Sequence, residues 1–99
     1  MSSEKEGVYE KRRELDDIRG DIKEWWKKIR KDERVRKKVL SMLDNAHRIV
    51  SEFEERHLPV QKDIYQMLYV GYCKVNVEER KGIKRRADRY RERVDTYEK

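Results

Sequence analysis

The chain has few of the residues that mark secreted, membrane-spanning or catalytic proteins. Its single cysteine, Cys73, cannot form a disulfide within the chain, so we expect an intracellular protein. The most apolar stretch, residues 64–77, is interrupted by polar residues and is shorter than the roughly 20 residues of a spanning helix, so we expect no membrane insertion. No Gly-rich loop is present to hold a nucleotide. The sequence shows no catalytic or cofactor motif.

Apolar residues are also scarce. Hydrophobic residues make up 35% of the 99 residues and charged residues 48%, about twice the share in an ordinary domain. Asn and Gln are rare while Lys, Arg and Glu are abundant, a bias typical of proteins from hyperthermophiles. We therefore expect one domain over residues 1–99 with high thermal stability.

The apolar residues that are present recur at three- and four-residue steps, the spacing of an amphipathic helix. They form four stripes, which predict an all-α fold: a compact bundle of about four helices over residues 3–30, 32–57, 60–74 and 77–97. A turn is expected near residues 30–34, with Asp32 as the N-cap of the second helix. Pro59 suits the first turn of the third helix, and Asn76 suits the N-cap of the fourth.

The third segment has a second interpretation. Residues 68–72 are rich in β-forming side chains, which would suit a strand. One strand would have no partner elsewhere in this chain, so we favour a helix. Because it is apolar on most sides, we expect it to lie centrally in the bundle.

The formal net charge of +6 is unevenly distributed. Residues 27–38 and residues 80–93 each contain eight Lys or Arg and two acids. On a helical wheel the second group places an arginine row in a sector without acids: Arg85, Arg86, Arg89 and Arg93. Such a row suits phosphate or carboxylate oxygens. The alternative is neutralisation inside the fold by acids of the first helix, namely Glu10, Glu14, Asp17, Asp21 and Glu24.

The first basic segment borders Trp26, and basic residues next to an aromatic ring can hold phosphates and stack bases. Alternatively, the ring is covered by the stems of long cationic side chains. No known DNA- or RNA-binding motif is present, so nucleic-acid binding would be weakly sequence-selective. The candidate residues outside the arginine row are Trp26, Lys27, Lys28, Arg30, Lys31, Arg34, Lys37 and Lys38.

A protein interface is the other candidate site. The third helix has more apolar and aromatic residues than one buried face needs, and the last stripe is narrow, like a coiled-coil seam. The candidate residues are Tyr69, Val70, Tyr72, Cys73, Tyr90 and Tyr97. The alternative is that the third helix is buried.

Two histidines each lie one turn after an acid, as Asp44-x-x-His47 and Glu54-x-x-His57. Metal sites in bundles take such pairs from facing helices, whereas both pairs here belong to one helix. We predict no metal, no cofactor and no catalytic residues. No small-molecule substrate is indicated.

The size, the richness in Lys, Arg and Glu, the scarcity of Asn and Gln, and the single Cys73 resemble the small proteins of filamentous viruses of hyperthermophilic archaea, the lipothrixviruses and rudiviruses. The resemblance implies a heat- and acid-resistant protein without enzymatic activity in the cytoplasm of an infected cell. It supplies no site residues.

The sequence predicts a small non-enzymatic interaction or structural protein that contacts itself or another protein, and the resemblance implies that it is viral. The alternative is weakly sequence-selective nucleic-acid binding by the arginine row and the basic helix–helix joint.

Overall fold

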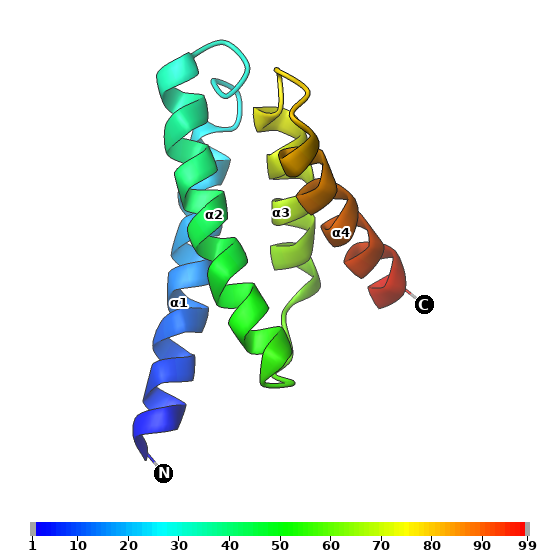
Figure 1. The fold of residues 1–99 in the computed structure, drawn as a ribbon. Helices are drawn as coiled ribbons and strands as arrows, with labels where there is room; N and C mark the ends of the chain where they lie inside the picture. Colours follow the sequence, from blue (N-terminus) through cyan, green and yellow to red (C-terminus); the bar gives the residue numbers. More distant parts are fainter. Residues whose placement is uncertain (1, 99) are drawn as a thin grey trace.

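The structure is a computed structural model that describes the backbone of residues 2–98 and the side chains of residues 7–97. Its helices are α1 (Ser2–Trp25), α2 (Glu33–Glu55), α3 (Lys62–Val75) and α4 (Lys81–Glu98) (Figure 1). The expected all-α fold is confirmed, and the segment with two interpretations is helical as α3.

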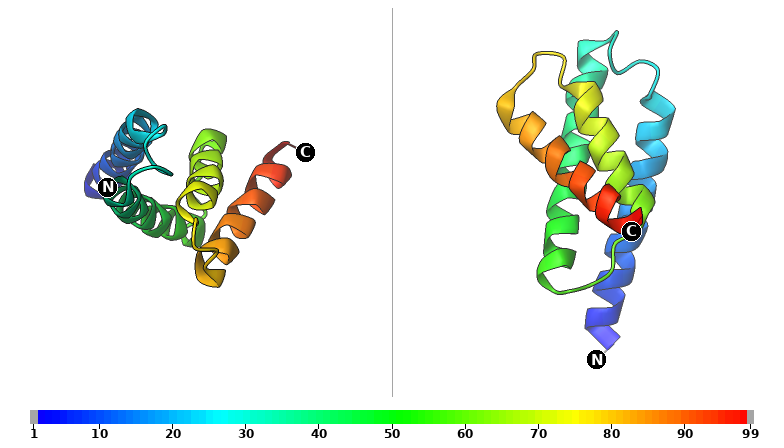
Figure 2. Two further views of the ribbon diagram at one scale, coloured as in Figure 1. Left: turned by 90° about the horizontal axis from the view of Figure 1, so that it is seen from above. Right: turned by 90° about the vertical axis from the view of Figure 1, so that its right-hand side faces the viewer.

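Successive helices run in opposite directions, but they do not close into a symmetric four-helix bundle (Figures 1 and 2). Helices α1, α2 and α3 contact one another, whereas α4 packs against α3. Within residues 2–98, no Cα atom of α4 lies within 8 Å of a Cα atom of α1 or α2. Therefore α4 lies on the far side of α3 from α1.

The apolar stripes meet in one core to which all four helices contribute. Burial of these side chains provides the main drive for folding, so the small apolar content is concentrated where it stabilises most. The largest side chains with less than 2% exposure are Tyr72, Tyr90, Phe53, Ile22, Ile29, Leu43 and Leu68.

The joint between α1 and α2 begins earlier than expected. The first helix was expected to reach residue 30, but it ends at Trp25 and residues 26–31 form hydrogen-bonded turns. Ile29 is fully buried and anchors these turns to the core. Asp32 is confirmed as the N-cap of α2, since its carboxylate accepts a 2.9 Å hydrogen bond from the Arg34 amide.

The second helix was expected to reach residue 57, but α2 ends at Glu55. Amides of His57 and Leu58 donate to the carbonyls of Glu54 and Phe53, the pattern of a Schellman motif. His57 occupies the left-handed position of this motif, with φ of 56°, where glycine is usual. The expectation that Pro59 starts the next helix is wrong, because the chain stays non-helical until Lys62.

The start of α4 was also placed too early. Asn76 ends α3, and α4 begins only at Lys81. Glu79 has a φ of 54°, which is incompatible with a right-handed helix. The Asn76 side chain still serves this connection, because its Oδ1 accepts a 2.7 Å hydrogen bond from the Arg80 amide.

Helices α2 and α3 approach closely at Gly71. A Cβ atom built on Gly71 would lie 2.8 Å from Cδ2 of Leu43, which is fully buried. Glycine is therefore required here by space rather than by backbone conformation. At Gly20, in contrast, an added Cβ would meet nothing within 4 Å.

We predict opposite effects of alanine at these two helical glycines. Gly20→Ala should raise the free energy of unfolding by about 0.5–1 kcal/mol, because alanine favours helix. Gly71→Ala should lower it by about 1 kcal/mol, because overpacking against Leu43 exceeds that gain. Chemical denaturation followed by circular dichroism would measure both. Equal stabilisation by the two variants would show that the contact between α2 and α3 tolerates a methyl group.

Candidate functional site

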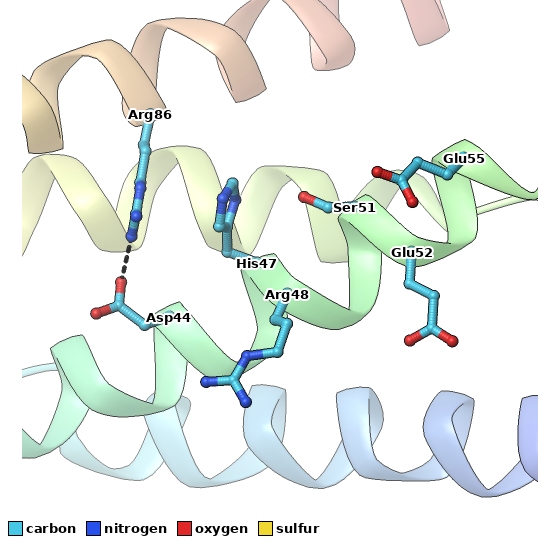
Figure 3. A pocket seen from close by; sticks show the side chains of 7 residues that line it. All are labelled: Asp44, His47, Arg48, Ser51, Glu52, Glu55 and Arg86. Atoms are coloured by element: carbon cyan, nitrogen blue, oxygen red, sulfur yellow. Dashed lines mark hydrogen bonds and ion pairs between the residues drawn. The ribbon is translucent and has the colours of Figure 1, made fainter.

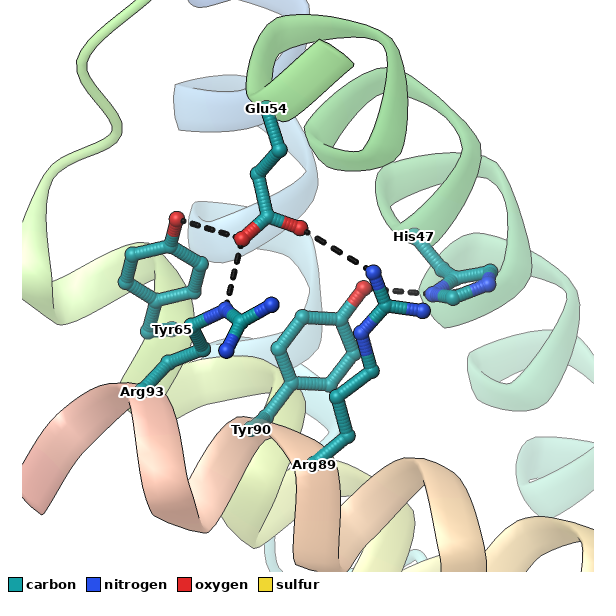
Figure 4. Close-up of polar contacts among 6 residues, drawn as sticks. All are labelled: His47, Glu54, Tyr65, Arg89, Tyr90 and Arg93. Carbon is teal, nitrogen blue, oxygen red and sulfur yellow. Dashed lines mark hydrogen bonds and ion pairs between the residues drawn. The ribbon is translucent and has the colours of Figure 1, made fainter. Parts of the chain in front are cut away.

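The arginine row of α4 is largely neutralised by α2 (Figure 4). Arg93 Nε lies 2.7 Å from Glu54, and Arg89 Nη2 lies 3.4 Å from the same carboxylate. Arg86 lies 2.6 Å from Asp44. Three of the four arginines are thus paired inside the fold. The acids that pair with them belong to α2, whereas acids of the first helix were expected. Arg85 is exposed, and its side chain has no hydrogen-bond or ion-pair partner within the described residues.

Tyrosines of α3 and α4 complete this network. The hydroxyl of Tyr72 donates to Asp44 over 2.8 Å, and that of Tyr65 donates to Glu54 over 3.1 Å. The rings of Tyr72 and Tyr90 are stacked, with centroids 6.4 Å apart and planes 5° from parallel. Both rings are fully buried, so the expectation that Tyr72 and Tyr90 belong to an exposed interface needs correction. They fill the space between α3 and α4.

The environment keeps these phenols protonated. Burial, reinforced by Glu54, raises the pKa of Tyr65 to about 12. Burial raises the pKa of Tyr90 to about 12 as well, and that of Tyr72 is also raised by burial and by Asp44. The hydroxyls of Tyr65 and Tyr72 therefore remain hydrogen-bond donors to the carboxylates of α2 at neutral pH.

His47 belongs to the same network. Its Nδ1 contacts the Tyr90 hydroxyl, and the two rings meet edge to face with centroids 5.7 Å apart. Burial, followed by the charges of Arg86 and Arg89, lowers the pKa of His47 below its usual 6.5, against the opposing effects of Asp44 and Glu54. His47 is therefore mainly neutral at pH 7.

An open groove of about 580 Å³ runs beside this network (Figure 3). Asp44, His47 and Ser51 line it from one face of α2, and Arg86 closes it from α4. These residues do not form a catalytic arrangement in which Ser51 is the nucleophile and His47 the base, because both side chains contact Tyr90. Asp44 is engaged by Arg86 and Tyr72. These side chains join helices. Within residues 7–97, no group of three or more His, Cys, Asp or Glu residues could hold a metal ion.

The basic joint, residues 27–38 at the connection between α1 and α2, leaves most of its charge unpaired, in contrast to the arginine row. Five of its cations have exposed side chains that make no ion pair or hydrogen bond within the described residues: Lys27, Lys28, Arg30, Lys31 and Arg34. Arg36 is the exception, since its guanidinium donates to the carbonyls of Ile29 and Arg30 over 3.3 and 2.9 Å. The turns are thus held by Ile29 and Arg36, while the five unpartnered cations face solvent.

Side chains next to the basic joint do little to neutralise its positive charge. Glu33 lies 3.7 Å from Lys37, an exposed pair that contributes little. Lys38 Nζ lies 4.8 Å from the ring centroid of Trp25. The half-buried ring of Trp26 is covered by a cation, as one alternative held, and the cation is Lys74 of α3 at 4.3 Å.

The remaining residues of the expected protein interface are scattered. Tyr69 and Val70 are half-buried on α3, and Cys73 is exposed beside them. Partial desolvation by neighbouring side chains, followed by the charge of Asp88, raises the pKa of the Cys73 thiol, which disfavours a nucleophilic role. Tyr97 is 53% exposed near the end of α4, against Tyr65. A protein interface through these residues stays a prediction, which a measurement of mass in solution would test for self-association.

Comparisons with protein-family models, with curated proteins and with solved structures gave no match for this chain. The resemblance to proteins of archaeal filamentous viruses and the expected thermal stability therefore remain predictions from composition. Within the described residues, no helix is both long enough and apolar enough to cross a membrane.

We predict that Glu54 contributes more to stability than an exposed glutamate. Glu54→Ala removes the acceptor shared by Tyr65, Arg89 and Arg93, and should lower the free energy of unfolding by about 1–2 kcal/mol. Glu33→Ala is the matched control and should change it little, because its pair with Lys37 is exposed. Similar losses in the two variants, measured by chemical denaturation, would contradict a special role for Glu54.

We also predict a pH dependence that originates in His47. Since the pKa of His47 is lowered in the folded state, the unfolded chain binds its proton more readily. The free energy of unfolding should therefore be highest above about pH 6.5 and fall as the pH is lowered from 7 to 5. His47→Gln should reduce this slope, whereas His57→Gln, at an exposed position, should retain it. An unchanged slope in His47→Gln would assign the effect to other groups.

Proposed function

We propose that this chain acts by binding rather than by catalysis, and that its ligand is nucleic acid contacted by the basic joint between α1 and α2. The observation that carries the proposal is the set of five exposed cations between Lys27 and Arg34 that have no side-chain partner within the described residues. Cations already paired in the fold give up part of their interaction when they bind a phosphate, whereas these do not. We propose that the chain binds this ligand inside the cell, the compartment expected from its single cysteine.

The surroundings of the joint support a polyanionic ligand. Three nearby acids are already engaged: Asp32 caps α2, Glu33 pairs with Lys37, and Glu78 lies 2.8 Å from Arg80. The connection between α3 and α4 lies at the same end of the molecule (Figure 1), and it leads into the exposed Lys81. Nucleic acid presents closely and regularly spaced phosphates, which suit such a cluster better than isolated carboxylates.

The proposal replaces the arginine row with the basic joint as the main contact. Arg86, Arg89 and Arg93 are paired with α2. Four of the five cations of the joint lie in the turns of residues 26–31, and Arg34 lies in the first turn of α2, so they do not form one helix face that could enter a groove. Phosphate contacts position a protein without reading bases, so binding to duplex DNA should be weakly sequence-selective.

We predict a steep dependence of duplex-DNA affinity on salt. Each phosphate neutralised contributes about −0.9 to the slope of log K against log salt, so five contacts would give a slope near −4.5. In a variant with Lys27, Lys28 and Lys31 changed to Gln, the slope should be shallower by about 2.7, because three phosphate contacts are lost. Fluorescence anisotropy of a labelled duplex over a range of salt concentrations would measure both.

The matched control changes Arg13, Arg56 and Arg91 to Gln, which removes the same charge from exposed positions outside the joint. Its slope should stay close to that of the unmodified protein. Equal losses in both variants would show that net charge, and not the joint, determines binding. Equally tight binding of polyglutamate would contradict a preference for phosphates over carboxylates. Absence of binding to both duplex and single-stranded DNA at low salt would eliminate the proposal.

A further inference from the structure

A second surface adjoins the basic joint. Between α1 and α3, the structure has an open groove of about 950 Å³. Both helices belong to the α1–α2–α3 part of the bundle, and α4 lies on the other side of α3 (Figure 2). The groove is thus left uncovered by the described part of this chain.

The walls of the groove combine an apolar surface with an aromatic ring. Ile22 and Met67 are nearly fully buried, at 1% and 7% exposure, and form its base. The half-buried side chains of Trp26 and Val70 complete the apolar part. Lys74 Nζ lies 4.3 Å from the centroid of the Trp26 ring, but Lys74 does not line the groove, whereas Trp26 does.

Polar groups at the two ends of the groove differ. At one end Arg19 and Asp63 form an ion pair across the helices. At the other end the groove reaches Lys27, the first of the five unpartnered cations. Lys23 and Glu24 add one charge of each sign to the lining. Lys27 thus supplies a cation that suits phosphate beside an indole ring that suits an aromatic ligand. Gln66, on the wall between these ends, offers both a donor and an acceptor.

We infer that the groove between α1 and α3 is a nucleobase subsite, in which a base leaves the strand and packs on Trp26 while its phosphates contact Lys27 and its neighbours. The inference rests on the proposed function and names its substrate class, single-stranded nucleic acid. Bases in a duplex are stacked on each other and cannot offer a face to Trp26, whereas those of a single strand can. A sugar polyanion has no base to place there.

The test compares ligands that differ in the base alone. Fluorescence anisotropy would measure the affinity of the full chain for labelled oligothymidylate and for an abasic oligomer of the same length. Oligothymidylate should bind about tenfold more tightly, in the range of one base stacked on an aromatic ring. Trp26→Ala should abolish this difference and leave the affinity for the abasic oligomer unchanged. Trp26→Phe, which keeps an aromatic face, should retain most of it.

Tyr9→Ala is the control, because Tyr9 is 69% exposed on α1 and lies outside the groove. It should bind both oligomers as the unmodified protein does. Circular dichroism would confirm that each variant keeps its helices. Equal affinity of the unmodified protein for the two oligomers would overturn the subsite while leaving the proposed function intact. Binding to neither oligomer, nor to a duplex, at low salt would overturn both.

Discussion

Two carboxylates of α2, those of Asp44 and Glu54, hold α4 in place and neutralise most of the arginine row that α4 carries. Long side chains make these contacts, since the backbones of α2 and α4 stay apart. The position of α4 thereby decides which positive charges of the chain remain unpaired. If Arg86, Arg89 and Arg93 pointed to solvent, the chain would have two competing basic surfaces. Because these three arginines are paired, the basic joint carries more unpaired positive charge than the arginine row does.

The stripes of apolar residues were enough to predict the fold class, the number of helices and the cap at Asp32, because each depends on local spacing. The helix ends were harder to predict. His57 and Glu79 adopt left-handed backbone conformations that sequence reasoning usually assigns to glycine or asparagine. Pro59 was read as a start signal, but the chain needs more residues to turn from α2 into α3.

The candidate site was predicted only in part, because its key contacts join distant positions. The wheel showed that Arg86 and its neighbours lacked acids on their own helix, but it could not show that acids of α2 would face them. Tyr72 and Tyr90 were read as surplus aromatics, yet α4 has few aliphatic residues and the tyrosine rings fill that contact instead. The signal that could have revealed this was the set of tyrosines on both helices at core positions. The basic joint was recognised from its composition and a turn was expected near residues 30–34, but the earlier end of α1 at Trp25, which places more of these cations in the turns, was not predicted.

The attachment of α4 also bears on the cooperativity of the molecule. Helices α1, α2 and α3 support one another pairwise, but α4 is held by one helix and by a set of polar contacts with another. The backbones of α3 and α4 pack together more extensively than those of any other two helices, so these helices form one cooperative unit. The carboxylates of Asp44 and Glu54 join α4 to α2 across the rest of the molecule. Any movement that separates α4 from α2 would therefore release three arginines at once, so the charge that this face presents depends on how the two helices are held together.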